Sequence, residues 1–202
     1  MIVVDVETTG LDPRRNSIVS IGAVEFENPS NQFYQECKVR SCSEISDGAL
    51  KINGFTRKEV ADIRKPTLIE TMHNFLDWSG ECREQTLAGH NISFDRGFLE
   101  ESLKHANAGN DKARIWPFGY RTIDAHTICY ASHLMHGIMP PLKDGKSNIN
   151  LDVALAYVGM PSEPKPHNAL TGAKVTAELL SRLVWGKVLF PEYSQYAIPG
   201  FL

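Results

Sequence analysis

Apolar residues recur along this chain with two different periods, which predict strands near the N-terminus and helices alternating with strands further on. Residues 2–6 form an apolar run broken by a single acid, as in a strand buried on both faces. Residues 67–78 carry apolar side chains at the spacing of one helical face. We therefore expect an α/β fold with a mixed sheet and helices on both faces. The predicted strands are 2–6, 17–26, 32–39, 86–91 and a segment that reaches Asp124, and the predicted helices are 67–78, a segment that starts near Asp95, a segment after Asp124, 151–158 and 169–185.

The segments between these elements read as turns and loops. Residues 44–63 favour short helices with turns, and residues 140–150 favour a loop. The 202 residues suit one domain, which we expect to cover residues 1–186. Residues 187–202 form an aperiodic, rather apolar tail that we expect to pack on its own domain, and a dimer contact is the alternative.

Composition narrows the class of protein without naming a function. The formal net charge of −3 argues against a broad basic surface for sequence-independent binding of nucleic acid. Bound divalent metals supply positive charge locally, so a nucleic-acid enzyme is still compatible with this balance. The four cysteines form no C-x-x-C pair, which argues against a zinc site. No signal peptide precedes the first strand and no apolar run could span a bilayer, so we expect a cytoplasmic protein with no membrane partner.

Two acids stand in the first strand, where most positions are apolar. Asp5 and Glu7 are two residues apart, so in a strand they point to the same face, about 6.6 Å from each other. Neighbouring carboxylates repel and are costly to bury, and the strand holds no Lys or Arg to neutralise them. A divalent cation with oxygen ligands is a usual solution. The alternative is a strand end at which both acids are exposed to water.

Two further polar segments precede predicted helices. The first, HNISFD, contains Asn91 and Asp95 at the junction of a strand and a helix, where Ser93 or Asp95 would also serve as an ordinary helix cap. The second, PHNALTG, places His167 just before the last long helix. A lone histidine is more often a surface or core residue than a catalyst, so neither segment indicates a function alone.

Together the three segments resemble the DEDDh family of 3′–5′ exonucleases, which includes ribonuclease T, oligoribonuclease-like enzymes and the proofreading subunit of bacterial replicative DNA polymerase. The family motif D-x-E-T-T-G matches DVETTG at residues 5–10, and N-x-x-x-D matches NISFD at residues 91–95. The third motif, H-x-A-x-x-D, matches HNALTG in His167 and Ala169 but not in its final acid. The order and spacing of the motifs cover residues 1–185, which makes a chance agreement of all three rare.

The resemblance implies a ribonuclease-H-like fold, a five-stranded mixed sheet with the Asp5 strand in its middle. It also implies two Mg²⁺ or Mn²⁺ ions held by Asp5, Glu7, Asp95 and a fourth Asp. Such ions bind phosphodiester oxygens, activate water and stabilise the leaving 3′ oxygen. His167 would be the general base, because an imidazole titrates near neutrality. The implied substrate-binding residues are Thr8, Thr9, Leu11, Asn91 and Phe94, the last of which would equally suit a core position.

Position 172 departs from the family pattern, because Gly172 stands where the resemblance implies the fourth metal-binding acid. Thr176 offers only a neutral hydroxyl, Glu178 lies about 240° round the helix, and Asp124 and Asp152 suit helix caps. The open explanations are an engineered inactive mutant, a natural variant in which water replaces the carboxylate at a weakened second metal site, and a natural non-enzyme. We favour the second, because the other four catalytic positions of the family are retained.

The function expected from this resemblance is metal-dependent 3′–5′ exonuclease activity. Its substrates would be single-stranded or frayed DNA or RNA 3′ ends, and its products 5′-mononucleotides. The alternative is an impaired or inactive member that binds nucleic-acid ends without cutting them. A ribonuclease-H-like endonuclease or a transposase-type enzyme is a third class, against which DVETTG and His167 both argue.

Overall fold

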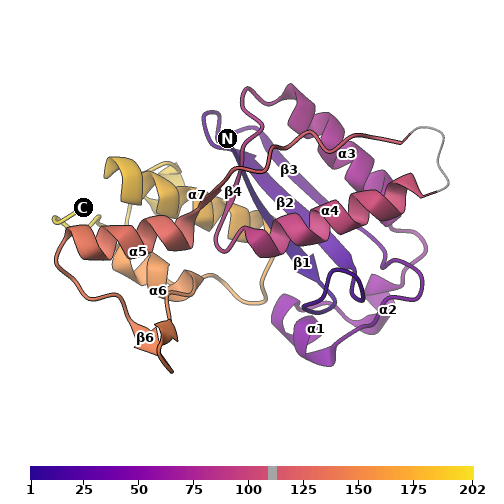
Figure 1. Cartoon of the computed structure of the whole chain (residues 1–202), viewed down its shortest axis with the longest axis horizontal. Helices are drawn as coiled ribbons and strands as arrows, with labels where there is room; N and C mark the ends of the chain where they lie inside the picture. The colour runs from indigo at the N-terminus through magenta and orange to yellow at the C-terminus, as the bar shows by residue number, and fades with distance from the viewer. Residues whose placement is uncertain (109–112) are drawn as a thin grey trace.

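A computed structural model of the chain describes residues 1–108 and 113–202 (Figure 1). Its centre is a five-stranded sheet in the order β3-β2-β1-β4-β5. The strands of this sheet are β1 (Ile2–Thr8), β2 (Ile18–Glu25), β3 (Gln32–Glu36), β4 (Leu87–Gly89) and β5 (Thr122–Asp124). The helices are α1 (Asp47–Asn53), α2 (Arg57–Val60), α3 (Leu68–Glu81), α4 (Ser93–Asn107), α5 (Ala125–Met135), α6 (Leu151–Tyr157), α7 (Ala169–Trp185) and the 3₁₀ turn η1 (Pro191–Tyr193).

The sheet is mixed, as the resemblance implies. Strands β1, β2 and β3 form an antiparallel meander, whereas β4 pairs in parallel with both β1 and β5. Strand β1 is therefore the middle strand of the five. The parallel pairing of β1 with β4 covers only Ile2 and Val3, so the second half of β1 extends past the end of β4. This opening places the end of β1 beside loops and helix termini.

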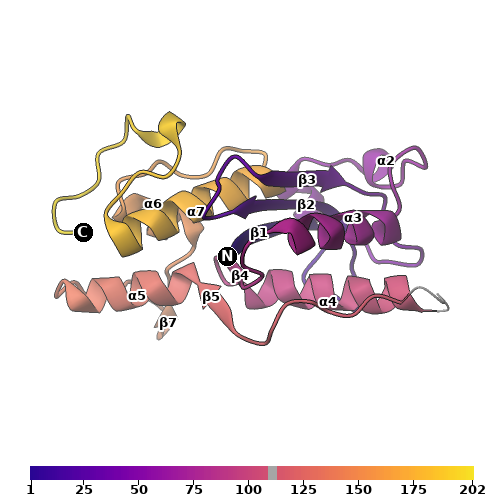
Figure 2. The ribbon, with the colours of Figure 1, turned by 90° about the horizontal axis from the view of Figure 1, so that it is seen from above.

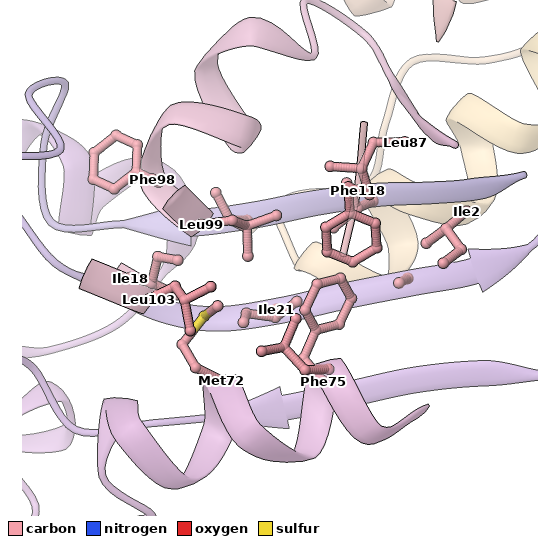
Figure 3. Packing of buried hydrophobic residues seen from close by; sticks show 14 of the residues in the cluster. Ile2, Ile18, Ile21, Met72, Phe75, Leu87, Phe98, Leu99, Leu103 and Phe118 are labelled. Carbon is pink, nitrogen blue, oxygen red and sulfur yellow. The ribbon is translucent and has the colours of Figure 1, made fainter. Parts of the chain in front are cut away.

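Helices cover both faces of the sheet, which confirms the predicted architecture. On one face, Ile2, Val4 and Val6 of β1 pack with side chains of α3 and α4, and Figure 3 shows Met72, Phe75 and Leu103 of this layer over the strands. On the other face, Val3 packs with side chains of α5, α6 and α7. Figure 2 shows α7 lying along the sheet on the side away from α4. Because neighbouring positions of β1 alternate between two buried layers, the strand is apolar throughout, except at its acids.

Helix α7 lies close to the sheet because Gly22 of β2 has no side chain. A Cβ atom at Gly22 would lie 2.1 Å from the backbone carbon of Ala169, the first residue of the helix. Asn168 caps this helix by accepting hydrogen bonds from the backbone N–H groups of Leu170 and Thr171. The close contact and the cap together fix where α7 begins against β2.

Several features differ from the elements predicted. Strand β1 continues to Thr8, β3 ends at Glu36 and α3 continues to Glu81. Residues 140–150, expected to be a loop, contain a small hairpin of β6 (Leu142–Lys143) and β7 (Lys146–Ser147). Asp144 and Gly145 between them have φ values of 50° and 72°, which a two-residue type I′ turn requires. The strand expected at 86–91 is also shorter, since β4 ends at Gly89.

The segment after α7 is held against the helix by hydrogen bonds to a buried ion pair within α7. Arg182 donates to Glu178 at 2.6 Å, and both side chains are inaccessible to solvent. The Arg182 guanidinium also donates to the carbonyl oxygens of Val158, Tyr193 and Tyr196. Glu178, which lies about 240° round the helix from Gly172, is thus engaged with Arg182 and with the segment after α7. Within the described residues, no helix has both the length and the apolar character needed to cross a membrane.

Candidate active site

The two acids of β1 point to the face that α7 covers. Side chains alternate along a strand, so Asp5 and Glu7 share the side of Val3. An ideal Cβ at Gly172 of α7 would lie 2.5 Å from Oδ2 of Asp5, so the Asp5 carboxylate rests directly against the bare helix backbone. Glu7 is 8% exposed, and the reading of the first acids as a water-exposed strand end is therefore wrong.

Asp95 joins this group through the backbone of β1. Its Oδ1 accepts a hydrogen bond of 3.0 Å from the N–H of Val6, a group that β4 does not reach. Helix α4 begins after Ile92 with no side-chain cap hydrogen bond, so neither Ser93 nor Asp95 has the capping role considered above. The hydrogen bond to Val6 brings the carboxylate of Asp95 beside the acids of β1, although the residues lie 89 positions apart.

A cleft of about 580 Å³ opens beside the end of β1. Of the residues expected to bind substrate, Thr8, Leu11 and Phe94 line it together with Glu7, and Leu11 is 84% exposed. The Thr8 hydroxyl donates to the carbonyl oxygen of Gly10. The remaining walls come from Val6 of β1, from Gly10 and Asn16 of the segment after it, from the loop before α1 and from α1 itself.

Two residues expected to bind substrate lie elsewhere. Thr9 is fully buried, and its hydroxyl donates to the carbonyl oxygen of Glu44 and accepts from the N–H of Ser17, so it holds the turn after β1. Asn91 lines a different surface depression, has a φ of 61°, and donates from its backbone N–H to Asp124.

His167 lies at the edge of the site, just before α7. Its backbone N–H donates to the carbonyl oxygen of Ile52 at the end of α1, which ties the loop to the cleft wall. The imidazole is 33% exposed, and its Nδ1 lies 3.4 Å from Oε2 of Glu163. Water can therefore reach the ring, while one of its nitrogens faces a carboxylate.

Glu163 is a fourth acid at the site that sequence reasoning did not single out. Its side chain is 5% exposed although it belongs to the loop between α6 and α7. Its backbone N–H donates to Asp152, which holds the loop against the first turn of α6. The only signal in the sequence is an acid four positions before His167 in a segment rich in proline.

Electrostatics show how closely these acids interact. Burial, aided by the charges of Asp95, Glu7 and Glu163, raises the pKa of Asp5 well above its ordinary value. Burial and then the charges of Glu163 and Asp95 raise the pKa of Glu7 to about 8. Burial also raises the pKa of Asp95 to about 7, against the opposing effect of the Val6 N–H. Burial and the charge of Asp152 raise the pKa of Glu163 to about 7.

The acids at the end of β1 fit a divalent cation. In the part of the chain that the structure describes, no Lys or Arg forms an ion pair with Asp5, Glu7 or Asp95, and one oxygen of Glu163 has no hydrogen-bond partner. A set of carboxylate oxygens suits hard ions such as Mg²⁺ and Mn²⁺. Among residues 1–108 and 113–202, no three acids, histidines or cysteines meet at one point, so the acids form a loose group rather than a closed cage.

The sheet topology and the acids on its central strand define the class of protein by its fold, which is ribonuclease-H-like, the fold of exonuclease structures. The chain belongs to the exonuclease family, whose RNase_T family model matches residues 2–180. This match confirms the family that the three motifs indicate.

Relatives of this chain include proteins of DNA polymerase III. The PolC-type DNA polymerase III of Thermotoga maritima is 29% identical over 183 residues, which are 91% of this chain but 12% of that protein. The epsilon subunit of DNA polymerase III from Buchnera aphidicola is 34% identical over 114 residues, which are 52% of this chain and 45% of that protein. The chain thus spans only a small part of the PolC-type relatives that it matches.

Solved structures show the same fold at low sequence identity. The nuclease domain of 3′hExo, a DEDDh family member bound to rAMP, has a TM-score of 0.66 at 17% identity, with 94% of this chain and 93% of that chain covered. Exonuclease I has a TM-score of 0.71 at 16% identity, with 92% of this chain and 40% of that chain covered. These likenesses confirm the ribonuclease-H-like fold of the chain.

Proposed function

We propose that this chain is a metal-dependent 3′–5′ exonuclease that acts on single-stranded or frayed DNA or RNA ends and releases 5′-mononucleotides. The observation that supports this proposal is the group of buried acids without basic partners at the end of β1, next to an open cleft. The relatives in DNA polymerase III also favour a nucleic-acid substrate.

The acids of β1 and α4 have a direct role in this proposal. Asp5, Glu7 and Asp95 would hold Mg²⁺ or Mn²⁺, in two ions of which the second is bound less tightly because position 172 lacks a carboxylate. Bound there, the ions neutralise the phosphodiester, activate water and stabilise the leaving 3′ oxygen. The hydrogen bond from Val6 keeps Asp95 in place before any ion arrives.

His167 is suited to accept a proton from the attacking water. Its Nδ1 lies 3.4 Å from Oε2 of Glu163, so Nε2 is the nitrogen proposed to accept the proton. The hydrogen bond to Ile52 fixes the loop that carries the ring. A general base in this position must lie at a water-accessible edge, and the ring does so.

The cleft offers surfaces for the last nucleotides. Leu11 and Phe94 place apolar groups in it, and bases stack on such surfaces with little regard to sequence. Phe94 also contacts Phe98 of the core with ring centroids 4.9 Å apart, so its ring is held from behind. We infer that the 3′ end lies between these side chains and the acids.

The test is a 5′-labelled single-stranded oligonucleotide incubated with the protein and Mn²⁺. A ladder of shortened products and released 5′-mononucleotides is expected, and circular DNA of the same sequence should stay intact because it has no end. The variant Asp5→Ala should give no ladder while remaining folded. A gel shift without any shortening would instead favour the second candidate, a protein that binds nucleic-acid ends, for which the missing acid at Gly172 is the motivating observation.

A further inference from the structure

Two buried glutamates, one in α7 and one in the loop before it, differ in how completely their oxygens are hydrogen-bonded. Glu178 has a complete set of partners, namely Arg182 and the backbone N–H groups of Leu189 and Phe190. Glu163 is also more than nine-tenths buried, yet its Oε1 has no hydrogen-bond partner among the described residues. Burying a carboxylate oxygen without a partner is costly, so this oxygen calls for a ligand that the protein itself does not supply.

The position of Glu163 says where such a ligand would lie. Its other oxygen, Oε2, lies 3.4 Å from Nδ1 of His167. The backbone N–H of His167 donates to Ile52, which lines the same cleft as Glu7. The free oxygen therefore belongs to a carboxylate beside the histidine, on the loop that is bound to the wall of this cleft.

Helix α7 itself contributes no carboxylate to the acids of β1. At Gly172 there is no side chain, and the Asp5 carboxylate occupies the space that a Cβ would need. No acid of α7 is thus available beside β1, since Glu178 is engaged with Arg182. A carboxylate on the loop between α6 and α7 does not need the space at Gly172 that Asp5 occupies.

We propose that Glu163 supplies the fourth carboxylate of the metal-binding group, in place of the side chain absent at position 172. This inference rests on the proposed metal dependence and extends it to a residue outside the three motifs. Glu163 would then be a metal ligand that belongs to a loop and not to a helix. Asp152 positions it by accepting a hydrogen bond from its backbone N–H.

The test measures metal binding without any nucleic acid. Mn²⁺ is titrated calorimetrically into the full chain as wild type, as Glu163→Gln and as Glu192→Gln. Glu192 is a matched control because it is also a glutamate, pairs with Lys174 of α7 and lies outside the site. Glu163→Gln should weaken Mn²⁺ binding about tenfold or more, and Glu192→Gln should leave it unchanged. Thermal unfolding without metal should show that both variants are folded.

A second variant moves the carboxylate to the helix. Glu163→Gln combined with Gly172→Asp should recover most of the lost Mn²⁺ affinity, because an acid again faces Asp5. Equal affinity of Glu163→Gln and wild type would overturn the inference and leave the proposed exonuclease untouched. Mn²⁺ binding that depends on Glu163, together with no cleavage of any 3′ end, would overturn the exonuclease and leave the inference standing. A wild type that binds no Mn²⁺ would overturn both.

Discussion

The close contact between Gly172 and Asp5 leaves no space for another side chain, and hence for another carboxylate, at this point of α7. The Asp5 carboxylate lies where a side chain on α7 would begin, at 2.5 Å from the ideal Cβ position. Any residue other than glycine must therefore displace Asp5 before it can be accepted. Steric crowding and charge repulsion act at the same atom, and two substitutions separate them.

Gly172→Ala and Gly172→Asp are expected to behave differently with metal. Alanine gains about 1 kcal/mol of helix propensity but crowds Asp5, and overpacking typically costs about 1–3 kcal/mol, so a small net loss of stability is expected. Aspartate adds repulsion to the crowding and should be the less stable variant in EDTA. Saturating Mn²⁺ should restore Gly172→Asp but not Gly172→Ala, as measured by urea unfolding. Equal responses of the two variants to Mn²⁺ would contradict this account.

His167 should matter for the rate and not for the metal. Replacing a general base typically costs about 10²- to 10⁴-fold in rate, and this loss is expected for His167→Ala on a labelled oligonucleotide with Mn²⁺. The affinity for Mn²⁺ should be nearly that of the wild type, because the ring is assigned no metal contact. A variant that loses both rate and affinity would move His167 into the metal-binding group.

The raised pKa values of the acids predict how the metal-free stability depends on pH. The pKa values of Glu7, Asp95 and Glu163 are raised to about 8, 7 and 7 by burial. Between about pH 4 and pH 8 the folded state thus keeps protons that the unfolded chain has released. The free energy of unfolding in EDTA should therefore fall as pH rises through this range. Saturating Mn²⁺ should remove most of the slope, since the ion binds the deprotonated acids. Urea unfolding at pH 5, 6.5 and 8 measures this, and a flat profile in EDTA would contradict it.

At the scale of elements, the contact of β2 with the start of α7 sets the position of the whole site. Gly22 lets the helix backbone approach the sheet, and the helix carries Gly172 onto Asp5. The loop with His167 and Glu163 leads directly into this helix, and His167 is bound through its backbone to Ile52 of α1. A single strand position thus supports the placement of groups more than a hundred residues away.

A methyl group at Gly22 should have a large effect. Its Cβ would lie 2.1 Å from the Ala169 backbone, which cannot rotate away, so Gly22→Ala is expected to lose at least about 3 kcal/mol of stability. Gly80→Ala is the control, because nothing lies within 4 Å of the added atom and Gly80 belongs to α3. This control should gain up to about 1 kcal/mol. Urea unfolding of the two variants in parallel measures both, and a mild loss at Gly22 would show that α7 can shift.

The sequence predicted the elements better than the contacts between them. Helix α7 was predicted at its observed bounds because its apolar period is long and unbroken. The hairpin β6–β7 was missed because strands of two residues have no period to detect. Glu163 was missed because it lies in a loop without periodicity, and no local pattern encodes its burial beside His167. The hydrogen bond of Asp95 to Val6 escaped notice for the same reason, since position alone suited a cap.

At the scale of the whole molecule, Arg182 joins parts of the chain that are far apart in sequence. Its guanidinium donates to Glu178 of α7, to the carbonyl oxygen of Val158 at the end of α6 and to that of Tyr196 after η1. Because every acceptor around it is a carboxylate or a backbone carbonyl, the buried charge is fully compensated. We infer that residues 187–202 belong to the folded unit through this centre.

Removing Arg182 should therefore destabilise the whole molecule. Arg182→Ala leaves Glu178 as an unpaired buried charge, and breaking such a pair costs about 3–5 kcal/mol. Arg64→Ala is the control, because Arg64 pairs with Asp62 while its side chain is 87% exposed. Exposed pairs contribute about 0–1 kcal/mol, so this control should stay near the wild type. Thermal or urea unfolding measures the difference, and similar values for the two variants would contradict the role assigned to Arg182.

The pairing of Glu178 with Arg182 also distinguishes this region from the end of β1, because here the counterion of the buried acid is part of the protein. An arginine is covalently part of the chain and cannot diffuse away, whereas a dissolved cation leaves whenever its concentration falls. The region around α6 and the C-terminal segment thus carries its own counterion at every dilution. Among the described residues, the acids at the end of β1 have no such built-in counterion, and protons or a dissolved cation must relieve their repulsion. Under the proposed metal dependence, the supply of ions would therefore set the local stability of this end of β1.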